Sequence, residues 1–222
     1  MLAGHLAVAL AAKGAEPKAP LGALVAATFW IDLLWPVLLL TGAETVSIEP
    51  GATAFTPLSF DAYPWSHSVA MVVGWSALAW GLARALGVAP RAAALIGGVV
   101  LSHWVLDLVT HRPDLPLWPG GPEAGLGLWD SIGGTILLEG ALLVGAVLLF
   151  TRRFPARDRL GRMGTVALVS VITVIWIAGP FSPPPPNEMA IAVAGLALWI
   201  LPVWAWRIER HLVVDRGSPA RA

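Results

Sequence analysis

Two ionisable residues one helical turn apart, His103 and Asp107, lie in the otherwise apolar segment LSHWVLDLVTH. Side chains four positions apart share one face of a helix, so a neutral imidazole and a carboxylate there can bind the same metal ion. Such a pair also suits a buried hydrogen bond between helices. It therefore indicates a metal site only together with further ligands.

Four other apolar segments supply further candidates, namely His5, Asp32, His67 and Glu139. Counting about 1.5 Å per residue from the basic end of each segment places these side chains at a similar depth. The estimates are roughly 18 Å for Asp32 and His103, 20 Å for Glu139, 24 to 25 Å for Asp107 and His67, and 12 Å for His5. Nitrogen and carboxylate ligands without thiolates suit zinc, and also manganese or iron.

The chain that carries these residues has the composition of a membrane protein. Of its 222 residues 57% are hydrophobic and 13% charged, with a mean hydropathy of +0.74, beyond what a soluble core needs. Basic and acidic residues number 14 each, which gives no basic surface for nucleic acid. The absence of cysteine excludes disulfides, a thiol nucleophile and any cysteine-ligated metal.

Six stretches are long and apolar enough to cross a bilayer, which takes roughly 20 residues per helix. They cover about 21–41, 65–87, 91–111, 128–150, 164–181 and 189–206. Loops rich in Gly, Pro and acidic residues separate them. The predicted fold is therefore all-α: a polytopic membrane helix bundle over residues 1–206, followed by a short basic cytoplasmic tail over 207–222.

The first apolar segment, MLAGHLAVALAAK, is too short to cross a membrane. It has no positive residue ahead of its apolar run, so it is not expected to be a cleavable signal peptide. As a re-entrant half-helix ending at Lys13 it would lift His5 to just below the other candidates. Half-helices are tolerated at membrane depth when protein buries them.

The Lys and Arg residues predict the orientation, because short cytoplasmic loops accumulate them. In a six-helix alternation every one of the 14 except Arg112 falls on the same side. Both termini are therefore expected in the cytoplasm. Arg112 directly follows His111 and could anchor an anionic substrate group such as phosphate. A local pair with Asp114 is the alternative.

In order and spacing, four motifs resemble a known family. They are an N-terminal GH, the aspartate of FWIDLLWP, the SHS of YPWSHSVAM and the histidine–aspartate pair of LSHWVLDLVTH. Over residues 1–140 they resemble the bacterial inner-membrane family of metal-dependent hydrolases, whose best-known members are LexA-regulated. That family is distantly similar to the zinc-dependent phospholipase C and S1/P1 nuclease group of all-helical hydrolases.

The resemblance implies a multi-pass protein of the bacterial inner membrane. It also implies His5, Asp32, His67, His103 and Asp107 as metal ligands or close neighbours. Two departures bear on a second ion. Leu34 stands where the family often has a second aspartate, and DAYPWSHS lacks a histidine–arginine pair that often precedes the family's Thr-His-Ser. One bound ion and two therefore stay equally open.

The expected activity is a hydrolase in which a metal activates water and polarises a carbonyl or phosphoryl group. Asp32 or Glu139 is the predicted general base, while His111 or Arg112 would meet an anionic group of the substrate. A lipid or lipid-linked phosphate ester of the membrane is the expected substrate. Because G-x-S-x-G is absent, a serine hydrolase is disfavoured. An ion- or proton-coupled transporter and a non-catalytic structural protein are the alternatives.

Each candidate also has a plainer interpretation. Asp32 could pair with a neighbouring helix, His67 could be hydrated near a helix start, and His5, Glu139 and His111 could be solvated or ion-paired. Ser66 and Ser68 fit helix-start groups better than nucleophiles. His211, among basic residues of the tail, is expected at the surface.

Overall fold

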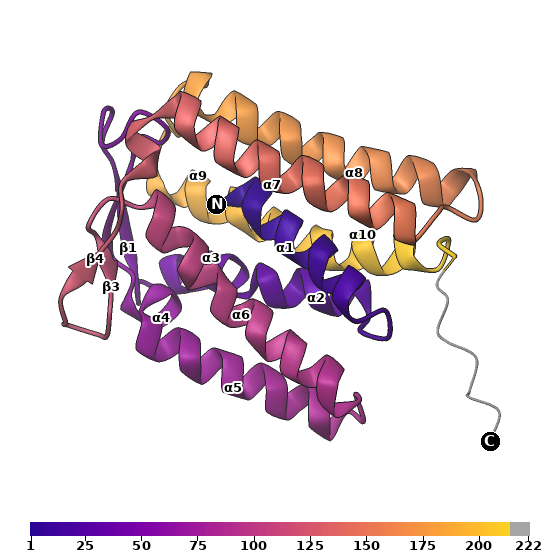
Figure 1. Ribbon diagram of the computed structural model, residues 1–222. Coiled ribbons are helices and arrows are strands. Elements are labelled where there is room, and N and C mark those ends of the chain that lie inside the picture. The colour runs from indigo at the N-terminus through magenta and orange to yellow at the C-terminus, as the bar shows by residue number, and fades with distance from the viewer. Residues whose placement is uncertain (214–222) are drawn as a thin grey trace.

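The computed structural model describes residues 1–213, most of which are helical (Figure 1). The predicted tail residues Arg216 and Arg221 lie outside the described part. The helices are α1 (Leu2–Ala15), α2 (Leu21–Thr28), α3 (Trp30–Leu40), α4 (Pro64–His67), α5 (Val69–Ala85), α6 (Pro90–Thr110), α7 (Ile132–Arg153), α8 (Arg159–Ala178), α9 (Glu188–Leu196) and α10 (Ile200–Glu209). Three short 3₁₀ segments adjoin them: η1 (Leu128–Asp130), η2 (Gly179–Phe181) and η3 (Ala197–Trp199).

Two small antiparallel hairpins, which the all-α prediction did not include, lie in two of the loops. In the first, β1 (Thr45–Ile48) pairs with β2 (Leu58–Ala62), and in the second β3 (Leu115–Pro116) pairs with β4 (Glu123–Ala124). Figure 1 shows both at the same end of the helix bundle. Val46, Ile48 and Phe60 favour the extended backbone of the first hairpin.

Within residues 1–213, four helical stretches are long and apolar enough to cross a membrane. They are Pro90–Thr110, Ile132–Arg153, Arg159–Phe181 and Glu188–Glu209. Helices α2 and α3 qualify together but bend by 53° between them, and they make a fifth if they form one span. At the bend, the Thr28 hydroxyl donates to the Leu24 carbonyl (2.8 Å), a contact that often bends helices.

The expected stretch 65–87 is divided between α4 and α5. Ser68 adopts an extended conformation between them, and its hydroxyl accepts a hydrogen bond from the Met71 amide. This is the helix-start role expected of Ser68. It leaves α5 with 17 residues, shorter than the four candidate spans.

Helix α1 lies in the middle of the bundle, against α2, α6 and α7 (Figure 1). Its buried alanines, including Ala3 and Ala9, allow neighbouring helices to approach closely. The connections α1–α2, α5–α6 and α7–α8 and the end of α10 lie at one end of the bundle, away from the hairpins (Figure 1). The basic residues of these connections therefore gather at one end.

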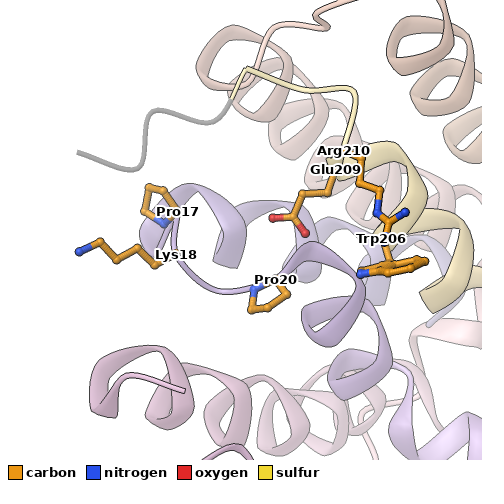
Figure 2. A pocket seen from close by; sticks show the side chains of 6 residues that line it. All are labelled: Pro17, Lys18, Pro20, Trp206, Glu209 and Arg210. Carbon is orange, nitrogen blue, oxygen red and sulfur yellow. The ribbon is translucent and has the colours of Figure 1, made fainter. Parts of the chain in front are cut away.

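A largely buried ion pair joins the last turn of α1 to the end of α10 at that end. Lys13 pairs with Glu209 and also donates to the Pro17 and Ala19 carbonyls, each at 2.8 Å. The other Glu209 oxygen accepts the Leu21 amide (2.8 Å). A surface cavity of about 510 Å³ lies beside the pair and is lined by Pro17, Lys18, Pro20, Trp206, Glu209 and Arg210 (Figure 2).

Candidate metal site

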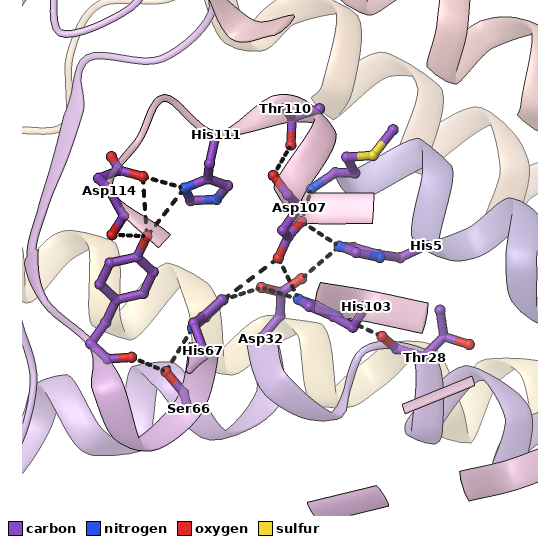
Figure 3. Close-up of polar contacts among 12 residues, drawn as sticks. His5, Thr28, Asp32, Ser66, His67, His103, Asp107, Thr110, His111 and Asp114 are labelled. Atoms are coloured by element: carbon purple, nitrogen blue, oxygen red, sulfur yellow. Dashed lines mark hydrogen bonds and ion pairs between the residues drawn. The ribbon is translucent and has the colours of Figure 1, made fainter. Parts of the chain in front are cut away.

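The five side chains predicted as ligands meet inside the bundle, near the hairpin end (Figure 3). They come from four helices: His5 from α1, Asp32 from α3, His67 from α4, and His103 and Asp107 from α6. Four of them are buried, and Asp32 is partly exposed. Convergence is expected from the sequence for Asp32, His67, His103 and Asp107, whereas His5, which the count places just below them, lies in the cluster itself.

Asp107 and Asp32 lie among the three imidazoles. Oδ2 of Asp107 is 3.0 Å from Nε2 of His103 and 3.9 Å from Nε2 of His67, and its Oδ1 is 3.2 Å from Nε2 of His5. The Asp32 carboxylate is 3.6 Å, 3.7 Å and 3.9 Å from Nε2 of His103, His67 and His5. Ligands bound at about 2.1 Å to one ion lie about 3.0 to 3.4 Å apart. The cluster therefore has nearly the dimensions of a coordination sphere.

The His103 ring is oriented by the bend between α2 and α3. Its Nδ1 lies 2.7 Å from the Thr28 carbonyl oxygen, which can only accept, so Nδ1 carries the proton. Carbonyls at a helix end lack partners within the helix and are free for such a contact. In the neutral ring Nε2 then presents its lone pair to the cluster, the arrangement of a metal-binding histidine.

Ser66 and Glu44 together orient His67, a contact that the sequence did not predict. Its Nδ1 lies 2.6 Å from Ser66 Oγ, which donates to Glu44 Oε2 (2.7 Å). Glu44 Oε1 also accepts the amides of Trp65 and Ser66, both at 2.8 Å. Glu44 is buried. This carboxylate therefore fixes the helix start and, through Ser66, the His67 ring.

His5 has the fewest partners of the three histidines. Its ring stacks on that of His103, with centroids 3.8 Å apart and planes 9° apart. Within the described residues neither of its nitrogens has a hydrogen-bond partner. A buried nitrogen without a partner is costly, and an ion bound at Nε2 would remove that cost for one of the two.

Glu139 lies beside the cluster and accepts the amides of Ala3 and Gly4, each at 3.1 Å. It thereby satisfies free N–H groups at the start of α1. Its second oxygen, Oε1, is buried with no partner among the described residues. The amino group of Met1 lies 3.1 Å from Asp107 Oδ1. The general-base role of Glu139 stays a prediction.

His111 follows α6 and forms a second polar group with Asp114 and Tyr63. Its Nδ1 is 3.0 Å from Asp114 Oδ1, and the Tyr63 hydroxyl donates to the Asp114 carbonyl (3.0 Å). Burial lowers the pKa of His111, outweighing the contribution of Asp114. Burial alone would raise the pKa of Asp114, but hydrogen bonds from His111, Arg112 and Tyr63 bring it below its usual value. A neutral imidazole therefore faces a carboxylate.

Arg112 is engaged by the protein itself. It donates to Asp114 Oδ2 (3.1 Å), to Ser59 Oγ (2.8 Å) and to the Ala52 carbonyl (3.4 Å). The local pair with Asp114 named as the alternative is thus present. The role of Arg112 as a substrate anchor stays a prediction.

The loop after α6 folds back over His111. A Cβ at Gly125 would lie 2.0 Å from the Arg112 carbonyl oxygen and 2.4 Å from that of His111, so only glycine fits. The Trp129 ring lies 4.4 Å from the His111 ring. These contacts pack part of the segment HRPDLPLWPGGPEAGLGLWDS, residues 111–131, against His111.

The remaining sequence expectation, a surface position for His211, agrees with the structure. Its Nδ1 pairs with Asp158 Oδ2 at 2.8 Å in an exposed setting. His211 therefore serves below as a control far from the cluster.

The described residues contain two overlapping groups that could hold a metal ion. One is His5, His103 and Asp107, and the other is Asp32, His67 and His103. Because His103 belongs to both, the geometry accommodates one shared site or two adjacent ones.

Comparison of the chain with models of known families, with curated proteins and with solved structures gives no match. The resemblance to inner-membrane hydrolases therefore stays a prediction. It rests on the four quoted motifs.

Proposed function

We propose that the protein is a membrane-embedded metal-dependent hydrolase that acts on an ester, in particular a phosphate ester, of a lipid or lipid-linked molecule. One observation carries this proposal: three imidazole nitrogens and two carboxylates converge in a buried cluster, and outer contacts orient two of the imidazoles. Histidines held in this way are typical of metal ligands. The resemblance to inner-membrane hydrolases is compatible with it.

The membrane arrangement proposed has six spans, formed by α2 with α3, by α4 with α5, by α6, by α7, by α8 and by α9 with α10. Helix α1 would be a re-entrant half-helix, supported by its 14-residue length and central position. The basic connections at one end of the bundle support a cytoplasmic location for that end and for both termini. The membrane proposed is the bacterial inner membrane.

Zinc is the metal proposed, since catalytic zinc is commonly held by histidines, alone or with a carboxylate. Manganese and iron accept the same donors with more ligands. All five side chains on one six-coordinate ion would leave one exchangeable position, whereas four-coordinate zinc would use three of them. A bound ion would supply Lewis-acid polarisation of the ester and a water of lowered pKa.

Different residues in and around the cluster would then accept the proton of the attacking water and donate a proton to the leaving group. Asp32 has the most exposed side chain of the cluster, which suits it to accept a proton from the attacking water. Glu139 is the second candidate, through its free Oε1. His111, oriented by Asp114, is the candidate acid or base for the leaving group.

Activity measurements test this proposal. Metal-loaded protein in lipid nanodiscs would be screened against phospholipids and isoprenoid-linked phosphates, beside Asp107→Asn and the distant control His211→Ala. We expect the Asp107→Asn rate to fall to that without protein and the His211→Ala rate to stay unchanged. Turnover that persists in Asp107→Asn would contradict the proposal. An ion flux lost in the same variant would favour the transporter, and neither activity would favour the structural protein.

A further inference from the structure

A second cavity, of about 450 Å³, lies next to the cluster. Its charged lining consists of Asp32, Glu139 and the terminal residue Met1. Most of its wall is apolar or aromatic and includes Trp35, Leu58, Phe60, Trp129, Trp176 and Leu198. Cavities of this size and character bind small, largely apolar molecules.

Asp32 is the connection between the cavity and the cluster. Its side chain is 25% exposed, whereas the other four cluster side chains are at most 5% exposed. Among the cluster residues it is also the one that lines the cavity. A molecule that reaches the cluster therefore comes past Asp32.

The cavity wall is continuous with an apolar outer surface. Ile175 lines the cavity and is also exposed on α8, where Val171 and Val174 are exposed too. In the proposed membrane arrangement this surface of α8 faces lipid. An occupant can thus enter from the bilayer rather than from water.

We infer that this cavity binds one hydrocarbon chain of an amphiphilic lipid and presents the lipid's polar group to Asp32. The placement of the lipid's polar group rests on the proposed function, whereas the placement of its hydrocarbon chain rests on the cavity alone. Lipid tails are about as apolar as leucine side chains, so moving a chain from the bilayer into the cavity changes little free energy. The cavity therefore exchanges chains freely with the bilayer, where lipid is in large excess, so it is occupied and positions the lipid with or without a bound metal ion.

Photolabelling tests the inference without depending on hydrolysis. Full-length protein would be placed in nanodiscs of phosphatidylglycerol containing a small fraction of the same lipid with a diazirine near the end of one acyl chain. After irradiation, mass spectrometry locates the labelled residues. We expect labels on Phe55, Leu58, Phe60 and Trp129, which line the cavity, with or without a metal chelator.

Variants that fill the cavity supply the comparison. In Leu198→Trp, and independently in Leu58→Trp, we expect cavity labelling to fall about tenfold because an indole occupies the space of the chain. Leu137→Trp is the matched control, since Leu137 is 75% exposed on α7 and does not line the cavity. It should leave cavity labelling unchanged.

The outcomes separate this inference from the proposed function. Labels confined to outward-facing helix surfaces, or cavity labels that both filling variants leave intact, would overturn the inference even if hydrolysis were observed. Cavity labels lost in both variants would support it even if every ester tested were stable.

Discussion

Nε2 of His103 lies 3.0 Å from Oδ2 of Asp107, yet within the described residues this nitrogen has no hydrogen-bond partner. Nδ1 of His103 donates its proton to the Thr28 carbonyl. In the neutral ring the lone pair of Nε2 therefore faces a lone pair of the Asp107 carboxylate. Such a contact is repulsive unless a cation lies between the atoms. That cation is either a proton on His103 or a metal ion, and only a metal ion can also bind the unpartnered Nε2 of His5, whose ring stacks on that of His103. A metal ion bound between these atoms would remove the repulsion between His103 and Asp107 and would also give Nε2 of His5 a partner.

The hydrogen bonds that orient His67 predict an effect on the affinity for a metal ion. Glu44→Gln keeps the size of the side chain but removes the charge that holds Ser66 and the helix start. We expect metal affinity to fall by about 10- to 100-fold, as is usual when an outer partner of a ligand is lost. Competition titration with a chromophoric chelator measures it. Glu49→Gln, at an exposed position, is the control, and equal affinity in both variants would exclude the role of Glu44.

The buried His111 predicts a pH dependence of stability. Burial lowers its pKa in the folded protein, so below about pH 6.5 the unfolded chain binds a proton that the folded chain does not. The contribution of His111 is thus intact above that pH and is lost as the pH falls toward the folded-state pKa. Thermal unfolding at pH 7.5 and 5.5 should show a smaller decrease in His111→Asn than in wild type. Equal decreases would count against a neutral His111.

The close approach of the loop after α6 predicts a steric effect. In Gly125→Ala the new Cβ would collide with backbone atoms of Arg112 and His111, so the loop must shift. We expect a loss of about 1 to 3 kcal/mol in unfolding free energy and a lower Tm. Gly145→Ala, where a Cβ meets no atom within 4 Å, is the matched control. Equal melting temperatures for the two variants would contradict the loop packing.

The proposed membrane orientation predicts the location of two loops. Gly51 lies between β1 and β2 at the hairpin end, whereas Arg159 begins α8 at the opposite end (Figure 1). Reporter fusions after these residues should therefore report opposite sides of the membrane, with the Arg159 fusion cytoplasmic. Fusions that report the same side would refute the arrangement.

The position of the cluster could be predicted because its residues stand out against their surroundings. In apolar helices of known rise, His103, Asp107 and Asp32 have a depth that can be counted from one end. Their convergence then follows from helices packed side by side. The mostly helical fold could be predicted for the same reason, since apolar runs of about 20 residues have few alternatives.

The contacts made by loops could not be predicted in this way. Glu44 reaches Ser66 across 22 positions, and Trp129 reaches His111 through a hairpin whose strands are two residues long. Such contacts depend on tertiary packing rather than on periodicity. The bend between α2 and α3 and the interruption at Ser68 also depend on local hydrogen bonds, so the sequence suggested two continuous stretches there.

Metal analysis of purified protein tests the central claim most directly. Wild type, Asp107→Asn and His211→Ala, each purified in detergent and dialysed with a trace of zinc, manganese and iron, would be measured by mass spectrometry for bound metal per chain. The account predicts stoichiometric metal in wild type and His211→Ala and a sharp loss in Asp107→Asn. A wild-type protein that carries no divalent metal, and binds none when it is supplied, would contradict the account.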